Sequence, residues 1–411
     1  MSILGWIFMA KTLILILFFT APLLALGQDI TVSATVIDKE TNEPLGYASV
    51  GLKSVAIGTI SNDRGEFDFH MPAEHRNDVM VISMLGYKNF EAPVWSMVGE
   101  AQIIKMEKSP IMLEEVVVSD TLTGQDILEI ALSRIKENYP MKPFLLDGFY
   151  RDVKKVGGTY ISLLEAAVRI YDDSYAEPRN KYKLRESVRL IEVRQSLGYE
   201  SRFTTYFDQD NLLEDLLLHN NIRYRHFEDG EKVFSQMIRE KNSFYNDHEA
   251  YVISYNGDYY MKLYIDTEDF SIIHFEFEQG FDDDYLGKKR DLFSKFAGIK
   301  KKIDFRKFQG KMYPSFISIT SKINWYDIQT RELKFETELF QQLLINKVIA
   351  DPRERIRSTE KMRNYGLQFQ DRPYNKRFWD NYNVIKETPL DQQVLKDLEK
   401  LAPLKEQFEE Y

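Results

Sequence analysis

Between Ile30 and Val118 the sequence consists of short runs in which apolar and polar residues alternate, and turn residues separate these runs. Val32, Ala34 and Val36 illustrate the spacing of two residues. This period is typical of antiparallel strands that bury one face and leave the other in water. The pattern predicts an antiparallel β-sandwich of about seven strands, with no helical stretch inside it.

A helical pattern begins at Thr123 and ends before Pro140. Asp126 follows Thr123 by three residues, as in a capping box at the start of a helix. The apolar face of this helix consists of Ile127, Leu128, Ala131, Leu132 and Ile135. We therefore expect a short helical connector after the sandwich.

Longer alternating runs return between Phe144 and Ile345 and predict a second, larger sheet. Apolar and polar residues alternate in two runs: Ile273, Phe275 and Phe277 with His274, Glu276 and Glu278, and Ile317, Ile319, Ile323 and Trp325 with Ser318, Thr320, Lys322 and Asn324. Such alternation over long strands indicates an antiparallel sheet with one wet face. Two further helices are expected, at Asn211–His219 and Pro389–Glu410.

These patterns define a mainly β fold, with an N-terminal seven-stranded β-sandwich, a larger curved antiparallel sheet and a few helices. The expected organisation is a signal peptide over 1–27, the sandwich over 28–118, the helical connector over 119–140, a large antiparallel β domain over 141–350, and a C-terminal tail with a helix over 351–411.

The N-terminus has the features of an export signal. An apolar run from Leu13 to Phe19 follows Lys11, and small residues at Ala25 and Gly27 precede a predicted cleavage before Gln28. An uncleaved membrane anchor is the alternative, because residues 3–26 are long enough to span a bilayer. The small residues Ala25 and Gly27 at the end of the segment, and the β-patterned sequence that follows, favour cleavage.

Composition narrows the functional classes. The 411-residue chain has no cysteine, which excludes disulfides, thiolate zinc sites, cysteine nucleophiles and acylated-cysteine anchors. An exported protein without disulfides suits a bacterial envelope, either the periplasm or the outer membrane. The net charge of −10 makes nucleic acid a poor partner. We expect no transmembrane helix after signal cleavage.

Several spaced residues of the sandwich region form a recognisable series. In order along the chain they are Val36, Asp38, Thr41, Pro44 and Leu45, then Ala48, Val50, Gly58, Thr59, Ser61, Asn62, Gly65, Phe67, Ser83, Gly86 and Tyr87. The region from Ile30 to Val118 resembles the carboxypeptidase regulatory-like domain, a transthyretin-like sandwich that often opens exported proteins of Bacteroidetes. Family members usually carry glycine where Ala34 stands. The resemblance implies a fold and no peptidase activity, because no H-x-x-E zinc motif occurs in the chain.

The acidic turn of this region could hold a metal ion or form a corner of the sandwich. Asn62 can hydrogen-bond nearby amides, and Gly65 can adopt the positive φ of a tight turn. A calcium loop needs more oxygen ligands than Asn62, Asp63 and Glu66 supply, and Arg64 lies among them. We interpret the turn as a corner.

A second resemblance begins at Tyr251. The segment to Ile273 reads as strand, Asn256-Gly257 turn, strand, acidic turn and strand. This order of strands and turns is similar to that of outer-membrane lipoprotein carrier proteins, whose curved sheet holds acyl chains. It implies a possible lipid ligand for the large β domain.

Candidate chemical residues have simpler interpretations. The six histidines are His70, His75, His219, His226, His248 and His274. Pro72 would break any zinc-binding helix between His70 and His75, and the other four are interpreted as packed or solvated. The carboxylates of Asp282–Asp284 and Asp266–Asp269 fit hairpin turns. The basic runs Lys288–Arg290 and Lys300–Lys302 lie near Phe293, Phe296 and Phe305, where aromatic residues could contact sugars or lipid head groups or simply belong to the core.

Three functional hypotheses remain from the sequence. The first is an exported, non-enzymatic cell-envelope protein that binds an apolar or amphipathic ligand, or an envelope protein partner, through its large β domain. The second is a carboxylate-dependent hydrolase of envelope glycan or peptide, and the third is a module that docks by strand addition. We assign no catalytic residue, no cofactor, no cofactor-binding residue and no metal ligand.

Overall fold

The computed structural model describes most of the chain after the expected signal peptide. The described residues are 29–109, 121–197, 202–207, 212–227, 230–280, 285–362, 366–370, 372–386, 396–400 and 403–409. The signal peptide over 1–27 and the acidic run at 282–284 lie outside them. Of the described helices, none combines the length and apolar character needed to cross a membrane.

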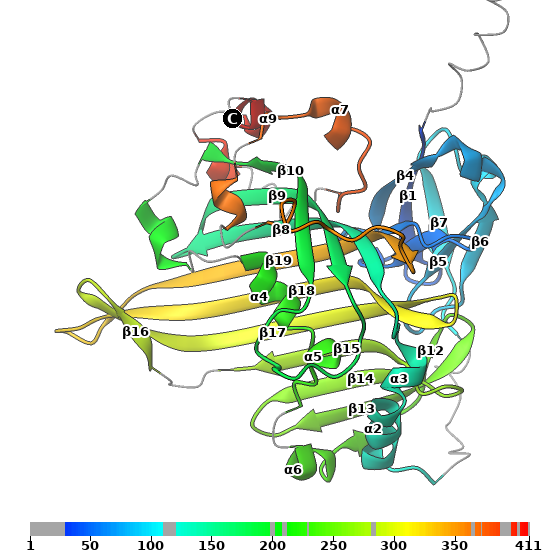
Figure 1. Cartoon of the computed structure of the whole chain (residues 1–411), viewed down its shortest axis with the longest axis horizontal. Helices are drawn as coiled ribbons and strands as arrows, with labels where there is room; N and C mark the ends of the chain where they lie inside the picture. The colour runs from blue at the N-terminus through cyan, green and yellow to red at the C-terminus, as the bar shows by residue number, and fades with distance from the viewer. Residues whose placement is uncertain are drawn as a thin grey trace, which may run out of the picture.

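The N-terminal region forms a β-sandwich of seven strands (Figure 1). The strands are β1 (Asp29–Asp38), β2 (Ser49–Leu52), β3 (Gly58–Ile60), β4 (Glu66–Pro72), β5 (Val79–Ser83), β6 (Phe90–Pro93) and β7 (Gln102–Met106). One sheet has the order β4-β1-β7 and the other β3-β2-β5-β6. The predicted strand number is confirmed, and residues from both sheets share one core.

Two details of the predicted sandwich are wrong. Strands β1 and β7 pair in parallel, because the chain crosses through the second sheet before β7 returns beside β1. The 3₁₀ helices η2 (Ala73–Asn77) and η3 (Val94–Ser96) also interrupt the region expected to lack helical turns. Each follows a proline that stands at the N-cap position, with ψ of 140° at Pro72 and 133° at Pro93. Ala34 pairs normally with Phe67 across β1 and β4.

The acidic turn forms the predicted corner. The Asn62 side-chain oxygen accepts hydrogen bonds from the amides of Arg64 at 3.0 Å and Glu66 at 2.8 Å. Gly65 has φ +75°, and a Cβ there would lie 2.2 Å from the Val36 carbonyl oxygen. The corner therefore requires glycine for its conformation and for its close contact with β1.

The second region is a twelve-stranded, antiparallel sheet. Its strands are β8 (Phe144–Val156), β9 (Thr159–Asp172), β10 (Ser187–Gln195), β11 (Ile238–Arg239), β12 (Ser243–Tyr245), β13 (His248–Asn256), β14 (Tyr260–Asp266), β15 (Ile272–Gln279), β16 (Tyr285–Lys289), β17 (Leu292–Phe308), β18 (Lys311–Asp327) and β19 (Leu333–Ala350). The main order is β10-β9-β8-β19-β18-β17-β15-β14-β13-β11, with β12 beside β13 and β16 beside β17. The larger antiparallel sheet is confirmed.

Short helices cover one face of this sheet and bury its apolar side chains. They are α2 (Gly124–Ser133), α3 (Ile135–Asn138), α4 (Leu212–Leu218), α5 (Asn221–Tyr224) and α6 (Gly230–Phe234). Thr123 and Asp126 form the predicted capping box of α2. Ile317, Ile319 and Phe275 face this helical layer and are buried. The opposite face carries the polar partners of the alternation, so the predicted wet face is confirmed.

The C-terminal region is less helical than the sequence pattern predicts. Its described elements are the 3₁₀ helix η7 (Leu367–Phe369), α7 (Lys376–Trp379) and α9 (Leu404–Glu409); a further 3₁₀ helix, η6 (Arg202–Tyr206), precedes α4. The single helix expected over Pro389–Glu410 is wrong, because residues 399–400 form a turn. Pro403 lies directly before α9 and cannot donate a hydrogen bond to continue a preceding helix.

The sandwich lies beside the large sheet (Figure 1), and its β2–β3 hairpin contacts β19. The Val348 amide donates to the Ala56 carbonyl at 2.9 Å, and Ile57 forms an antiparallel bridge with Lys347. Ile60 joins a small core that includes Phe316 of β18. Backbone pairing and apolar packing therefore fix the hairpin against β19 and β18.

A C-terminal segment connects the sandwich to the sheet from the other side. The Asn383 side chain accepts from the His70 amide at 2.7 Å and donates to the His70 carbonyl at 2.9 Å. Lys386 pairs with Asp68 at 3.0 Å, and Trp379 packs near Phe149 of β8. The residues 372–386 thus contact both the sandwich and the large sheet.

Two positions of the sandwich require glycine for different physical reasons, and an experiment can distinguish those reasons. Gly65→Ala combines a left-handed φ with a clash against backbone, and we expect it to lower the free energy of unfolding by about 3 kcal/mol. Gly86 has φ +83°, and the place where its Cβ would lie is open space, so Gly86→Ala should cost only about 1 kcal/mol. Urea unfolding of both variants measures the difference. Equal losses would contradict the role assigned to the Gly65 contact.

Candidate binding cavities

The alternation of the large sheet distributes its charged residues between two faces, and a cavity lies on each face. The junction cavity lies between the sandwich and the wet face of the sheet, and has a volume of about 370 Å³. The sheet–helix cavity lies on the opposite, helix-covered face and has a volume of about 620 Å³. Both volumes fall within the range of about 300–1,000 Å³ found for small-molecule sites.

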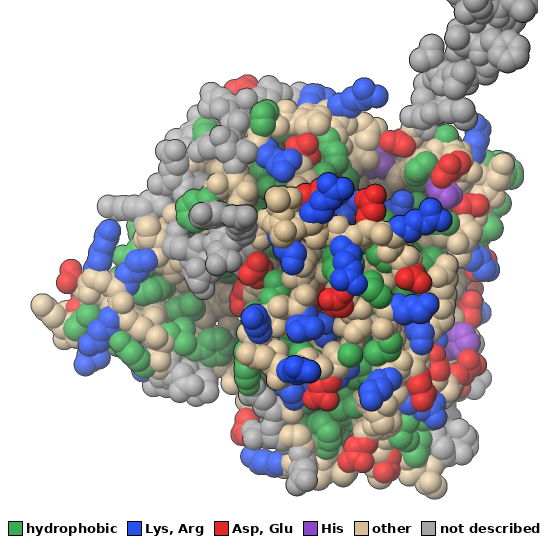
Figure 2. Space-filling view, viewed as in Figure 1, with side chains coloured by type: hydrophobic (Ala, Val, Ile, Leu, Met, Phe, Trp, Pro, Cys, Tyr) green, Lys and Arg blue, Asp and Glu red, His purple; other side chains and the backbone are tan. Residues whose placement is uncertain are grey.

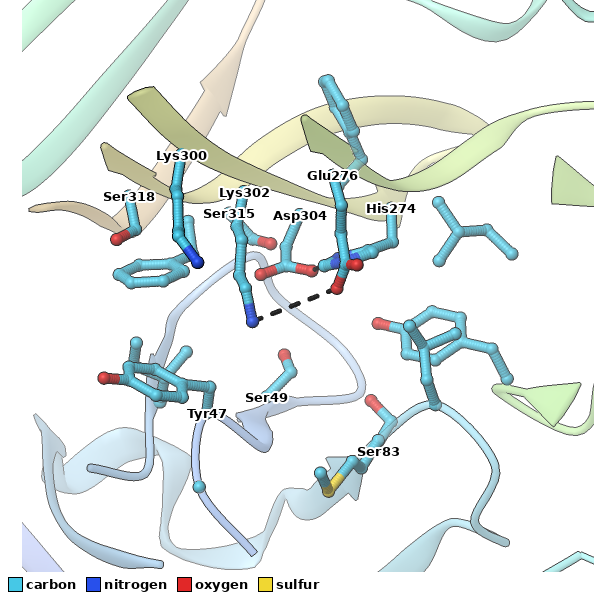
Figure 3. A pocket seen from close by; sticks show the side chains of 18 of the residues that line it. Tyr47, Ser49, Ser83, His274, Glu276, Lys300, Lys302, Asp304, Ser315 and Ser318 are labelled. Carbon is cyan, nitrogen blue, oxygen red and sulfur yellow. Dashed lines mark hydrogen bonds and ion pairs between the residues drawn. The ribbon is translucent and has the colours of Figure 1, made fainter. Parts of the chain in front are cut away.

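Both modules supply the walls of the junction cavity (Figure 3). Its lining includes aromatic and aliphatic side chains, hydroxyl groups and charged groups: Tyr47, Ile60, Met84, Leu85, Tyr245, Ile273, Phe305, Phe316 and Phe340; Ser49, Ser83, Ser315, Ser318 and Thr320; His274, Glu276, Lys300, Lys302 and Asp304. Figure 3 shows Lys302, Glu276 and Asp304 extending from the sheet toward Ser49 and Ser83 of the sandwich.

His274 forms the centre of a carboxylate clamp, here defined as His274, Asp304 and Glu276. Its Nδ1 hydrogen-bonds to Asp304, and its Nε2 lies 3.0 Å from a carboxylate oxygen of Glu276. Burial by itself lowers the pKa of His274, but the two carboxylates outweigh burial and raise it to about 9. The hydrogen bond from His274 lowers the pKa of Glu276. The clamp therefore holds an imidazolium between two carboxylates at neutral pH.

The basic run at Lys300–Lys302 is divided by the pleat of β17. Lys300 and Lys302 line the junction cavity, whereas Lys301 lines the sheet–helix cavity. The Lys301 ammonium lies 5.0 Å from the centre of the Phe277 ring, close enough for a cation–π contact. One short sequence motif therefore contributes to two separate sites, because neighbouring residues of a strand point to opposite faces.

The sheet–helix cavity has a mixed lining. Apolar walls come from Leu218, Phe227, Val233, Phe234, Met261, Phe277, Phe296 and Ile299, and polar groups come from Tyr182, Asp215, His219, Asn221, His226, Asp258, Tyr259, Gln279 and Lys301. Strands β14, β15 and β17 form its floor, and α4 to α6 contribute to the opposite wall. Such a lining can hold an apolar body and orient one polar end of a ligand.

The protonation or hydrogen bonding of three polar residues of this cavity follows from the structure. Burial lowers the pKa of His219 to about 3, with Lys301 and His226 contributing, so its imidazole is neutral at pH 7. His226 hydrogen-bonds through Nε2 to the Lys181 carbonyl at 2.9 Å. Asn221 donates to the His226 carbonyl, but its buried side-chain oxygen has no hydrogen-bond partner among the described residues. That oxygen has almost no accessible surface, so it is an unsatisfied polar atom within the cavity wall.

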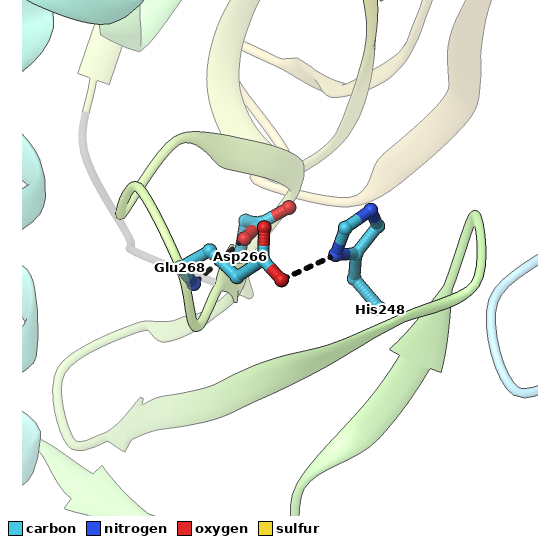
Figure 4. Close-up of side chains that lie close together, drawn as sticks. All are labelled: His248, Asp266 and Glu268. Atoms are coloured by element: carbon cyan, nitrogen blue, oxygen red, sulfur yellow. Dashed lines mark hydrogen bonds and ion pairs between the residues drawn. The ribbon is translucent and has the colours of Figure 1, made fainter.

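A third cluster comprises His248, Asp266 and Glu268 at the ends of β13 and β14 (Figure 4). One donor atom from each lies within 4.8 Å of the others, and His248 pairs with Glu268 at 3.1 Å. One nitrogen and two carboxylate oxygens could ligate a transition metal. However, Asp266 also accepts from the Glu268 amide as an ordinary turn residue, and Lys307 lies 3.9 Å from its carboxylate. The predicted turn at Asp266–Asp269 accounts for this geometry.

Buried ion pairs occur at the other end of the sheet. Arg223 pairs with Asp172 at 2.6 and 2.9 Å, and Glu186 hydrogen-bonds to Tyr224. Burial, together with the nearby Asp172 carboxylate, raises the pKa of Glu186 to about 7 against the opposing effect of Arg223. This acid has partners on two sides and lines neither cavity, so its raised pKa follows from its position in the core.

Charged side chains on the visible surface do not separate by sign. Figure 2 shows Lys and Arg interspersed with Asp and Glu on one face of the molecule. A nucleic-acid-binding surface instead gathers basic residues into a patch or stripe.

Three histidines line cavities that the sequence pattern does not predict: His274 in one cavity, and His219 and His226 in the other. His274 is clamped beside a cavity, whereas the pattern predicts a packed or solvated residue, and its alternation with Glu276 is the available signal. His219 and His226 share a cavity that the sequence does not reveal, because their segment folds across strands more than 30 residues away. His70 and His75 make local hydrogen bonds to Thr31 and Asp78, both at 2.8 Å.

Comparison with known proteins identifies one part of the chain. Residues 32–118 match the family model of the CarboxypepD_reg-like domain, which confirms the first resemblance. A search of the curated proteins found no match.

Solved structures with partial likeness to this chain include the following three proteins. An outer membrane lipoprotein-sorting protein domain from Vibrio parahaemolyticus has 10% identity and a TM-score of 0.22, with 56% of this chain and 95% of that chain covered. A LolA superfamily protein from Nitrosomonas europaea has 15% identity and a TM-score of 0.20, with 55% and 94% covered. A membrane-associated protein of unknown function from Bacteroides fragilis has 9% identity and a TM-score of 0.16, with 79% and 99% covered. At these TM-scores the likenesses carry no argument about function.

The carboxylate clamp predicts a specific pH dependence of stability. The folded pKa of His274 lies above its ordinary value of 6.5, so its stabilising contribution is complete below pH 6.5 and disappears as the pH rises through 9. The stability difference between the wild type and His274→Gln should therefore shrink by about 3 kcal/mol across this range. Urea unfolding at pH 6.5, 8 and 9.5 measures it.

His248→Gln is the matched control for this prediction. His248 also pairs with a carboxylate, but its side chain is 43% exposed, and solvent screens such pairs strongly. Its stability difference should stay small at each pH. A His274→Gln difference that does not change between pH 6.5 and 9 would contradict an imidazolium in the clamp.

Proposed function

We propose that this protein is an exported, non-enzymatic cell-envelope protein whose large β domain binds an apolar or amphipathic ligand in the sheet–helix cavity. The mixed lining of this 620 Å³ cavity is the observation that carries the proposal. The apolar N-terminal segment supports export through a cleaved signal, and the lack of cysteine agrees with a bacterial envelope location.

The cavity combines apolar walls with polar groups. Phe277 and Ile299 project from the sheet, while Leu218 and Phe234 close the apolar wall from the helices. Burying apolar ligand surface here would contribute about 25 cal/mol per Å². The polar side chains of the lining, which include His219 and Lys301, supply hydrogen-bonding groups for the polar end of a ligand.

A hydrolase is less favoured by the geometry. That alternative requires an unpaired acid with a raised pKa inside a pocket. Glu186 has a raised pKa, but it hydrogen-bonds to Tyr224, lies 3.9 Å from Arg223 and lines neither cavity.

Docking by strand addition is also less favoured at β10, an edge strand of the large sheet. Its Val188 carbonyl accepts from the Met362 amide at 2.8 Å, and its Ile191 carbonyl accepts from Arg372 at 2.9 Å. Residues near the C-terminus therefore already occupy edge groups that an added strand would use.

Cavity-filling substitutions test the proposed ligand site. Ile299→Trp and Leu218→Trp add bulk to side chains that line the sheet–helix cavity, and both should reduce ligand occupancy at least tenfold because the space is finite. The measurement is native mass spectrometry of residues 28–411 extracted from envelope material. The wild type should retain a lipid of defined mass.

Ile103→Trp is the matched control, because Ile103 is 68% exposed on the sandwich. It should retain ligand as the wild type does. A ligand-free mass for the wild type, both as extracted and after incubation with phosphatidylethanolamine–phosphatidylglycerol vesicles, would overturn the proposed function. Unchanged occupancy in both cavity variants would overturn the assignment of the site.

A further inference from the structure

We propose that the junction cavity is a second binding site, which takes a small anionic sugar derivative: a carboxylate or phosphate attached to a hydroxyl-rich ring. The site is independent of the ligand proposed for the sheet–helix cavity, because the two cavities lie on opposite faces of the sheet and share no lining residue. Its volume of about 370 Å³ lies near the lower end of the range for small-molecule sites.

The charges of the cavity favour an anion. The imidazolium of His274 balances one of the two negative charges of Asp304 and Glu276, to which it is hydrogen-bonded. Lys300 and Lys302 add two positive charges, so the positive groups of the lining outnumber the negative groups by one. The cavity is therefore locally positive, although the whole chain carries a net charge of −10.

Both lysines can exchange their present contacts for a ligand. Lys302 lies 3.9 Å from Glu276, too far for a hydrogen bond. Lys300 pairs with Glu278 at 2.8 Å, but the two side chains are 65% and 47% exposed. Exposed ion pairs contribute only about 0–1 kcal/mol, so an anion that contacts both ammonium groups can replace this pair.

Hydroxyl groups from both modules surround the charged part of the cavity. In the part of the chain that the structure describes, the hydroxyls of Ser49, Ser315 and Ser318 have no hydrogen-bond partner in the protein. Each can both donate and accept a hydrogen bond. Together they match the alternating donor and acceptor character of sugar hydroxyls.

Tyr47 supplies an aromatic wall and has an unusual backbone conformation. Its φ is +62°, its residue is 43% exposed, and its ring stacks on Phe316 with the centres 5.6 Å apart. A left-handed conformation costs a bulky residue on the order of 1–3 kcal/mol, and such outliers cluster at ligand sites. Here the strained backbone directs an aromatic ring to the cavity, where it can pack against the apolar face of a sugar ring.

Isothermal titration calorimetry on residues 28–411 at pH 7 and low salt tests the proposal. The probes are galacturonate and glucose 6-phosphate, with galactose, glucose and inorganic phosphate as comparisons. We expect at least one anionic sugar to bind tenfold or more tightly than its neutral counterpart and than phosphate alone. Lys302→Gln should weaken that binding at least tenfold.

Two further variants distinguish binding in the junction cavity from a general effect of charge on the strand. Lys307→Gln removes the same charge from the same strand, outside the cavity, where Lys307 pairs with Asp269 at 2.6 Å, and it should leave binding unchanged. Tyr47→Gly removes the ring and relieves the positive φ, which offsets part of the packing lost at Phe316, and it should weaken binding of the anionic sugar. It should leave the weak binding of phosphate unchanged.

Three results would overturn the proposal. One is that neither anionic sugar binds more tightly than its neutral counterpart. Another is that inorganic phosphate binds as tightly as the sugars, which indicates an adventitious ion only. The last is that Lys302→Gln and Lys307→Gln weaken binding equally. The test is independent of lipid occupancy, so it can fail while the proposed function stands.

Discussion

The contact between the β2–β3 hairpin and β19 is the interaction on which the rest of the structure depends. It combines a backbone hydrogen bond from Val348 to Ala56 with an antiparallel bridge between Ile57 and Lys347. The chain has no cysteine, so non-covalent contacts alone hold the sandwich on the sheet. Docking covers part of the wet face, and this partial cover creates the junction cavity. Without the contact, the carboxylate clamp at His274 would lie on an open surface.

The hairpin also accommodates a cation from the sheet. Gly51 and Gly58 face the guanidinium of Arg306, and a Cβ on either glycine would lie within 2.5 Å of one of its nitrogens. The two glycines thus leave a notch that Arg306 fills. Burial lowers the pKa of Arg306, but an arginine stays charged throughout the physiological range. Shape and pairing together set the position of the two modules, and the cavities follow from that position.

Local features of the fold could be predicted from the sequence, whereas features that depend on long-range register could not. Alternation reveals the sandwich and the wet face, and Thr123 with Asp126 reveals the start of α2, because each signal lies within a few residues. The parallel pairing of β1 with β7 depends on how the chain crosses between sheets. The clamp joins His274 to Asp304 through the register of β15 and β17, which alternation alone does not specify. The domain boundaries at 118, 140 and 350 remain predictions.

The most direct test of this account is a cysteine crosslink across the docking contact. The natural chain has no cysteine, so Ile57→Cys with Lys347→Cys gives one defined pair, and opposed residues of an antiparallel pair lie about 4.5–5.5 Å apart. The account predicts that mild oxidation forms this disulfide nearly completely and preserves the native fold. A control pair of Ile57→Cys with Lys334→Cys, at the far end of β19, should not crosslink. Failure of the first pair to form a disulfide, or equal crosslinking of both pairs, would contradict the docked arrangement.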